Sequence, residues 1–292
     1  MKLKIFGTGS FAFNVDGTTG RVSYMRYLSR TAAKRLFAIC VVAAFAGESH
    51  ADPLAFVGYS GGSFGTIDLT TGAVTSLGSL GQTPAGLGVF DGSLYAESYN
   101  NNGTLYSVNT SNGALTPIGN SGVFYAGGFG STLNGLYGVG YFSGGTTLDL
   151  FSINASNGSA TDLGSTGLSL GAWRDISTNS NTLYFGNGAD LYSLNLTTGA
   201  ASLIGAYGNG AQMGSLVTVG GTLYGADDVG DKINTIDTST GAATAGSSSG
   251  GSVWGLAPDP LPTSAPVPEP ATLSLVGLGL AGVGFMRRRK RN

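Results

Sequence analysis

The chain of 292 residues contains a single cysteine, Cys40, and a single histidine, His50. Both precede residue 52, so the longer remainder has neither residue type. Without cysteine, that remainder cannot form disulfide bonds or use a thiol nucleophile. Without histidine, it also lacks the groups for a serine triad, a cysteine-histidine pair or the usual zinc sites. Carboxylates are the groups that remain for acid–base chemistry.

Basic residues are equally scarce in the middle of the chain. Between residues 52 and 270 only Arg174 and Lys232 are basic, against fourteen acidic residues, so this part has a net charge of −12. Such a surface repels phosphate backbones, which argues against nucleic-acid binding, and it attracts cations, including calcium. The 51 glycines follow no glycine-every-third pattern, so a collagen-like chain is excluded and tight turns are favoured.

The first 51 residues are typical of an export leader. Four basic side chains precede an apolar run at residues 36–47, and small residues flank His50. We therefore predict a signal helix that signal peptidase cleaves after Ala51. The 12-residue run is too short to cross a bilayer core of roughly 30 Å, and its flanks disfavour the alternative, a buried core helix. The leader is longer than export requires, so Met25 is an alternative start.

The C-terminal end combines three features in a fixed order. Val267 precedes the triplet Pro268, Glu269 and Pro270, and an apolar run then extends over residues 271–286. A basic cluster follows, made of Arg287, Arg288, Arg289, Lys290 and Arg291. Residues 267–292 resemble the PEP-CTERM sorting tail of exported bacterial proteins, and a proline-rich linker at residues 259–266 precedes them.

This resemblance implies that exosortase, a membrane-embedded cysteine protease, recognises the tail and processes it near the triplet. It also implies an exported protein of a Gram-negative bacterium, at the cell surface or in an extracellular matrix, in a setting of exopolysaccharide production. The apolar run of 16 residues gives a helix about 24 Å long, short for a permanent anchor. We therefore expect transient membrane insertion, with the basic cluster on the cytoplasmic side; a permanent transmembrane helix stays the alternative.

One short motif recurs five times between these ends. Each copy has an apolar residue, an Asp or Asn, two further residues, a Thr or Asn, and a glycine. The glycines are Gly72, Gly113, Gly158, Gly199 and Gly241, spaced by 41, 45, 41 and 42 residues. This interval is typical of a four-stranded propeller blade. The Asp or Asn can accept a bond from the backbone two residues on, and the glycine can take a positive φ, so each motif predicts a hairpin turn.

Short β-rich segments around the turns predict four strands per repeat. The second to fifth blades are predicted at residues 85–119, 126–164, 172–205 and 214–246. The first repeat supplies three strands only, and a spare strand at residues 252–257, around Trp254, could complete it and close the ring. Gly246 predicts a weak outer strand in the fifth blade. We predict an all-β, five-bladed β-propeller over residues 54–258; an open solenoid or a six- or seven-bladed ring are the alternatives.

Acidic residues outside the turns are the candidates for chemistry. They are Asp91, Glu97, Asp149, Asp175, Asp190, Asp227 and Asp228. Some propellers place two or three acids around the central pore to cleave sugars, so a glycoside hydrolase or polysaccharide lyase is the alternative function. These acids share no motif, and we expect a non-enzymatic protein with no catalytic residue. Asp68 and Asp237 occupy turn positions where other repeats have Asn, so we assign them to structure.

One loop is a candidate for metal binding. Asp227, Asp228 and Asp231 place three carboxylates around Gly230, which could bind calcium, although the loop lacks the glutamate of an EF-hand. A solvated hairpin tip is the alternative, and we expect no cofactor. Several aromatic residues in polar loops could stack on sugars or fill the space between blades: Tyr59, Tyr99, Phe124, Tyr125, Tyr141, Phe142 and Tyr207. Together these features predict an exported structural or binding protein with polysaccharide or surface proteins as partners.

Overall fold

The computed structural model describes residues 2–6, 10–14, 53–99, 103–141, 147–169, 174–179 and 182–259. The chain forms two compact units, Met1–Ala51 and Asp52–Asn292. In the first unit, β1 (Lys2–Phe6) pairs antiparallel with β2 (Ser10–Asn14). No helix in the described ranges is long and apolar enough to cross a membrane.

Several predicted segments lie outside the described residues. They are the signal helix with its cleavage site at Ala51, the linker beyond Asp259, and the sorting tail at residues 267–292. Their boundaries therefore stay predictions.

The second unit is built from five antiparallel sheets of four strands each. In the first sheet, β22 (Val253–Asp259) is followed in space by β3 (Leu54–Tyr59), β4 (Ser63–Asp68) and β5 (Val74–Ser79). The second sheet contains β6 (Pro84–Phe90), β7 (Ser93–Ser98), β8 (Thr104–Val108) and β9 (Leu115–Asn120). The third contains β10 (Phe124–Thr132), β11 (Gly135–Tyr141), β12 (Asp149–Ile153) and β13 (Ala160–Ser165).

The last two sheets repeat the same order. The fourth contains β14 (Arg174–Asn179), β15 (Thr182–Asn187), β16 (Asp190–Leu194) and β17 (Ala201–Ala206). The fifth contains β18 (Met213–Val219), β19 (Thr222–Asp227), β20 (Lys232–Ile236) and β21 (Ala243–Ser248). The prediction of an all-β, five-bladed propeller is confirmed.

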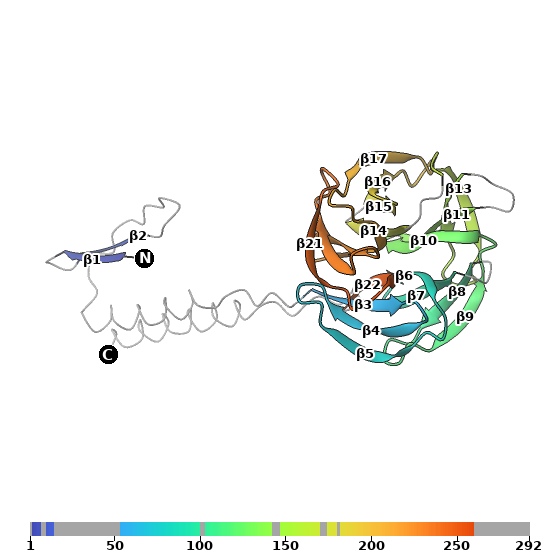
Figure 1. Ribbon diagram of the computed structural model, residues 1–292, viewed down its shortest axis with the longest axis horizontal. Helices are drawn as coiled ribbons and strands as arrows, with labels where there is room; N and C mark the ends of the chain where they lie inside the picture. The colour runs from blue at the N-terminus through green and yellow to red at the C-terminus, as the bar shows by residue number, and fades with distance from the viewer. Residues whose placement is uncertain are drawn as a thin grey trace, which may run out of the picture. The chain divides into compact units, whose positions relative to one another are not determined.

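The first strand of each sheet faces the centre of a ring, as Figure 1 shows. Around the axis, β6 lies beside β10, β10 beside β14, β14 beside β18, β18 beside β22, and β22 beside β6. The last strand of the ring, β22, pairs with its first strand, β3, so that Asp259 lies opposite Leu54. The first and last strands of the propeller are therefore hydrogen-bonded neighbours in one sheet.

The core lies between neighbouring blades. Phe56 and Phe64 of the first blade share a buried cluster with Leu87 and Leu94 of the second. The fourth and fifth blades are joined in the same way, through Leu191 and Leu216 among others. One face of each sheet is thus covered by the preceding blade and the other face by the following blade. Because both faces are covered, the strands lack a simple polar–apolar alternation.

The five repeated motifs form turns of the predicted kind. In every copy the glycine N–H donates to the carbonyl of the Asp or Asn four residues earlier, at 2.8 Å, and the glycine φ lies between +74° and +80°. In every copy the Asp or Asn Oδ1 also accepts a bond from the N–H two residues on, at 2.8 to 3.0 Å. The structural assignment of these turns is confirmed.

Each turn also contacts the outer strand of the preceding blade, which the sequence did not predict. A methyl group added at Gly119 of β9 would overlap the backbone oxygen of Asn157, in the next turn. Gly78, Gly164 and Gly205 meet the turns of the second, fourth and fifth blades in the same way. At the remaining junction, Ser247 Oγ of the fifth blade donates to the carbonyl of Thr70 in the first turn. The motif therefore joins blades as well as strands.

The fifth outer strand differs from its prediction. With six residues, β21 has the same length as β5, β9, β13 and β17. Its ladder with β20 skips Gly246, where a Cβ would lie 2.6 Å from the carbonyl oxygen of Ile233. A glycine that allows close backbone approach at a bulge does not shorten the strand.

Candidate functional site

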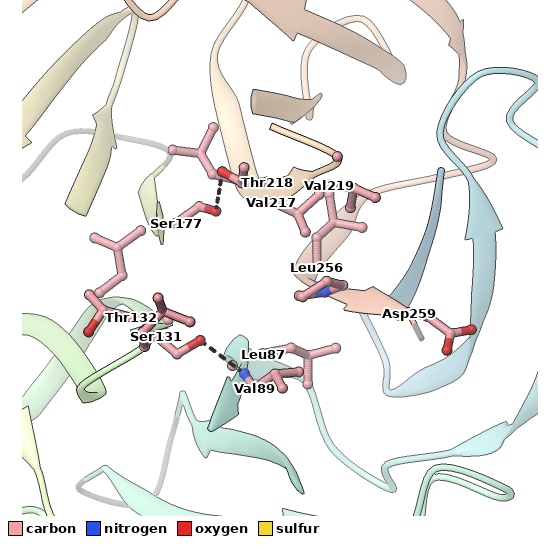
Figure 2. Close-up of a pocket in the computed structure, with 17 residues that line it drawn as sticks. Leu87, Val89, Ser131, Thr132, Ser177, Val217, Thr218, Val219, Leu256 and Asp259 are labelled. Atoms are coloured by element: carbon pink, nitrogen blue, oxygen red, sulfur yellow. Dashed lines mark hydrogen bonds between the residues drawn. The ribbon is translucent and has the colours of Figure 1, made fainter. Parts of the chain in front are cut away.

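A funnel-shaped cavity of about 330 Å³ lies at the centre of the ring. All five innermost strands line it, as Figure 2 shows: Leu87 and Val89 come from β6, Ser131 from β10, Ser177 from β14, Val217 from β18 and Leu256 from β22. The lining comes from the second half of each strand, and Leu133 at its margin is 75% exposed. The funnel therefore opens where the inner strands end.

The polar groups of the funnel are mostly hydroxyls that bridge blades. Ser131 Oγ accepts a bond of 3.0 Å from Val89 N–H, which joins the second and third blades. Ser177 Oγ and Thr218 Oγ1 lie 3.5 Å apart across the fourth and fifth. Asp259, at the edge of the cavity, is the single ionisable residue among the described residues of its lining, and burial raises the pKa of that carboxyl. The funnel offers apolar walls and hydroxyls rather than a pair of acids.

Asp175 lies toward the start of β14, beyond the cavity, and is completely buried. Its Oδ1 accepts bonds from the N–H groups of Ile176 and Phe129, at 2.8 and 3.3 Å. Its Oδ2 accepts bonds from Ser215 Oγ and Leu216 N–H, at 2.8 and 3.1 Å. Burial raises the pKa of Asp175 well above its usual range, and these four bonds partly oppose the shift. Both oxygens are engaged in holding three inner strands together.

The other acidic candidates are dispersed over the blades. Asp91 lies exposed in the turn between β6 and β7 with a φ of 48°. Asp149 starts β12 in the third blade, where burial and the nearby Asp162 raise its pKa. Asp190 starts β16 in the fourth. Among the described residues, no three His, Cys, Asp or Glu side chains converge in a way that could hold a metal ion. Asp91, Asp149 and Asp190 thus lie on three different blades.

The Asp227 to Asp231 loop uses its first two carboxylates for hydrogen bonds. Asp227 Oδ1 accepts bonds from Gln212 N–H and Val229 N–H, at 3.0 and 3.1 Å. Asp228 Oδ1 accepts bonds of 3.2 Å from Ser252 Oγ and Val253 N–H, at the start of β22. Calcium binding by this loop stays an untested alternative. The Asp227 bonds lie within the fifth blade, and the Asp228 bonds join the fifth blade to the first.

Glu97 is a buried carboxyl of β7 with an incomplete set of partners. Its Oε1 accepts a bond of 3.0 Å from Ser121 Oγ, whereas its buried Oε2 has no hydrogen-bond partner among the described residues. Burial raises the pKa of Glu97 to about 7, and the Ser121 bond opposes that shift. Glu97 was a candidate acid by its residue type and position outside the turns, but no sequence pattern indicated that it is buried between blades.

The aromatic candidates divide into several groups. Tyr207 is fully buried and packs between the fourth and fifth blades, so its role is structural. Tyr59 is half-buried, and its hydroxyl donates to the carbonyl of Ser249 at 2.8 Å. Tyr99 meets Trp254 edge to face, with ring centroids 5.1 Å apart and ring planes at 85°. Tyr141 is half-buried against the cluster of the third and fourth blades. The side chains of Phe124, Tyr125 and Phe142 lie outside the described residues.

Comparison with solved structures and curated sequences gives distant similarities. A nidogen/laminin complex is 11% identical, with a TM-score of 0.45, over 70% of this chain and 97% of that chain. The PQQ-bound aldose sugar dehydrogenase of Streptomyces coelicolor is 13% identical, with a TM-score of 0.43, over 60% of this chain and 85% of that chain. No curated protein sequence shows a significant match.

A family model matches the C-terminal end of the chain. Residues 266–290 match the PEP-CTERM protein-sorting motif, which agrees with the resemblance of residues 267–292. The chain is therefore an exported protein that carries a PEP-CTERM sorting signal, the signal by which exosortase substrates are recognised.

Proposed function

We propose that this protein is a non-catalytic binding scaffold, delivered by its sorting tail to the cell surface or the extracellular matrix. The sorting motif at residues 266–290, attached to a rigid ring, carries this proposal. Exosortase would process the tail after transient insertion of its apolar run, and the propeller would then present its loops to extracellular polysaccharide or surface proteins. Loops held by a rigid framework are the usual place for recognition.

The distribution of acids supports a binding role over a hydrolytic one. Glycosidases use two carboxyl groups about 5 to 9.5 Å apart, on either side of the scissile bond. Here Asp175 accepts four hydrogen bonds, and Asp259 is the one ionisable residue that the described part of the chain contributes to the funnel lining. A reducing-sugar assay on neutral and acidic polysaccharides checks this point. We expect no release above background, and turnover on any of them would establish the hydrolase or lyase alternative instead.

The sorting step has its own test. Changing Pro268, Glu269 and Pro270 together to alanine removes the triplet that the exosortase recognises, so the unprocessed precursor should accumulate in the membrane fraction. Pro260→Ala with Pro262→Ala, in the linker, is the matched control and should be processed normally. Immunoblots of membrane and secreted fractions measure both forms. Normal processing of the triplet variant would refute the sorting assignment.

A further inference from the structure

Three of the five innermost strands, β6, β18 and β22, have a bulge near their start, at the end of the strand away from the funnel. The ladders skip one residue in each of three blades: Ala85 between Pro84 and Gly86, Gly214 between Met213 and Ser215, and Trp254 between Val253 and Gly255. A bulged residue is released from the ladder, and its side chain can be aimed away from the sheet. Two blades have Ala or Gly at this place, and the first blade has a tryptophan.

Trp254 is the centre of a small aromatic and polar cluster. Its indole meets Tyr99 of the second blade at 85°, and both side chains are half-buried. Its Nε1–H donates to Ser252 Oγ at 2.9 Å, and Ser252 Oγ donates to Asp228 Oδ1 at 3.2 Å. Two perpendicular rings beside a hydroxyl and a carboxylate are thus assembled from three blades. We refer to Trp254, Tyr99, Ser252 and Asp228 as the aromatic cluster.

The aromatic cluster and the two ends of the described propeller lie at opposite ends of β22. Residue 254 lies near the start of this strand, and the last described residue, Asp259, lies at its other end. Leu54 pairs with Asp259 and is also at that other end. The described chain therefore enters and leaves the ring at the end of β22 that lies away from Trp254.

We propose that the aromatic cluster binds a neutral oligosaccharide, an assignment that rests on the proposed role as a binding module. Indole and phenol rings offer a large apolar surface with a polar edge, which fits a pyranose ring with an apolar C–H face and hydroxyls at its rim. Ser252 Oγ is bonded to both Trp254 and Asp228, and Asp228 Oδ2 is buried, so these two groups hold the indole in place and the rings supply the contact to the sugar. The net charge of −12 between residues 52 and 270 disfavours uronic-acid chains and selects uncharged sugars.

Calorimetric titration of the full chain, in mild detergent, tests this assignment. The probes are cellohexaose, maltohexaose and laminarihexaose, with tetragalacturonic acid as the anionic comparison. We expect at least one neutral probe to bind and the anionic probe to fail. Tyr99→Ala and Trp254→Ala should each weaken binding at least tenfold, while Trp254→Phe retains a ring and loses less. Leu133→Ala, on the funnel face, is the control and should leave the affinity unchanged.

Thermal unfolding of each variant separates loss of binding from loss of fold, and Tyr99→Ala is informative even if Trp254→Ala, in β22, fails to fold. In a Trp173→Phe background Trp254 is the single tryptophan of the chain, so its emission should shift on binding. Binding that persists in both alanine variants would overturn the site. Absence of binding to every neutral probe, or tighter binding of the anionic one, would overturn the ligand class. Processing of the tail is assayed separately, so a failure of sugar binding would leave the sorting assignment unchanged.

Discussion

Glu97 is held to Ser121 by a single hydrogen bond of 3.0 Å, and its second oxygen is buried without a partner among the described residues. Burial raises the pKa of this carboxyl from 4.5 to about 7. Because the folded state binds the proton more tightly than the unfolded state, the free energy of unfolding falls as pH rises between these values. The Glu97 contribution is complete below about pH 4.5 and lost above about pH 7, a difference of about 3 kcal/mol.

Glu97→Gln should remove most of this dependence. The amide cannot ionise, so the variant should be more stable than the wild type at pH 8 and similar to it at pH 4.5. Urea unfolding at several pH values measures the difference. Asp91→Asn, at an exposed turn position that tolerates positive φ, is the control and should keep the wild-type profile. If the free energy of unfolding depended on pH in the same way in Glu97→Gln and in the wild type, Glu97 would not be a buried ionisable group.

Asp175→Asn should destabilise the ring by about 2 to 4 kcal/mol. The amide nitrogen cannot accept the bonds that one carboxylate oxygen accepts, so two buried donors lose their partner or meet another donor. Ser215→Ala removes only the 2.8 Å hydroxyl bond and should cost about 1 kcal/mol. Chemical denaturation of both variants gives the comparison, and equal stabilities would show that Asp175 does not hold the inner strands.

Gly119→Ala tests the contact between turns and neighbouring blades. Its methyl group would overlap the backbone oxygen of Asn157, so the second and third blades must separate, at a cost of about 1 to 3 kcal/mol. Gly135 has only the edge of Tyr137 within reach, at 3.9 Å, so Gly135→Ala is the matched control and should be nearly neutral. Calorimetric unfolding compares the two variants. If Gly119→Ala were as stable as the wild type, the second and third blades would adjust to the added methyl group without cost.

Removal of residues 252–258 tests whether β22 stabilises the ring. This deletion leaves β3 without its inner neighbour and removes the buried Val253 and Leu256. We expect the unfolding midpoint to fall by at least about 10 °C, because the deletion removes three buried apolar side chains, including Ala257, and a ladder of backbone bonds. Deletion of the seven linker residues 260–266 is the length-matched control and should not change the midpoint. An unchanged midpoint in the first deletion would refute closure as a source of stability.

The repeated turn made most of the architecture predictable. Asp68 and Gly72, with their four counterparts, fixed the number of blades because local side-chain chemistry alone decides such turns. Blade positions followed within a few residues; the second blade, for example, was predicted at residues 85–119, and its strands β6 to β9 extend from Pro84 to Asn120. The contact of Gly119 with Asn157 was not predictable. These residues are 38 positions apart in the sequence and meet only because the second and third blades pack together, which no local sequence pattern indicates.

The chemistry of the candidate site was less predictable. The sequence grouped Glu97 and Asp175 with exposed acids such as Asp91, because burial of a carboxylate depends on which strand faces which blade. Trp254 was expected only as part of a spare strand. Its bulge and its contact with Tyr99 arise from the register of β22 against β3 and from the closure of the ring, both of which depend on the whole fold.

The run of β22 from Trp254 to Asp259 has a mechanical consequence. A propeller tethered through its tail and gripped at the aromatic cluster would carry tension along this one strand. Because both points lie on β22, the load would run through the covalent backbone of that strand, and its bonds to β3, which lie across the strand, would keep it seated in the sheet. The strand that joins the two ends of the ring would then also be the strand that carries the load.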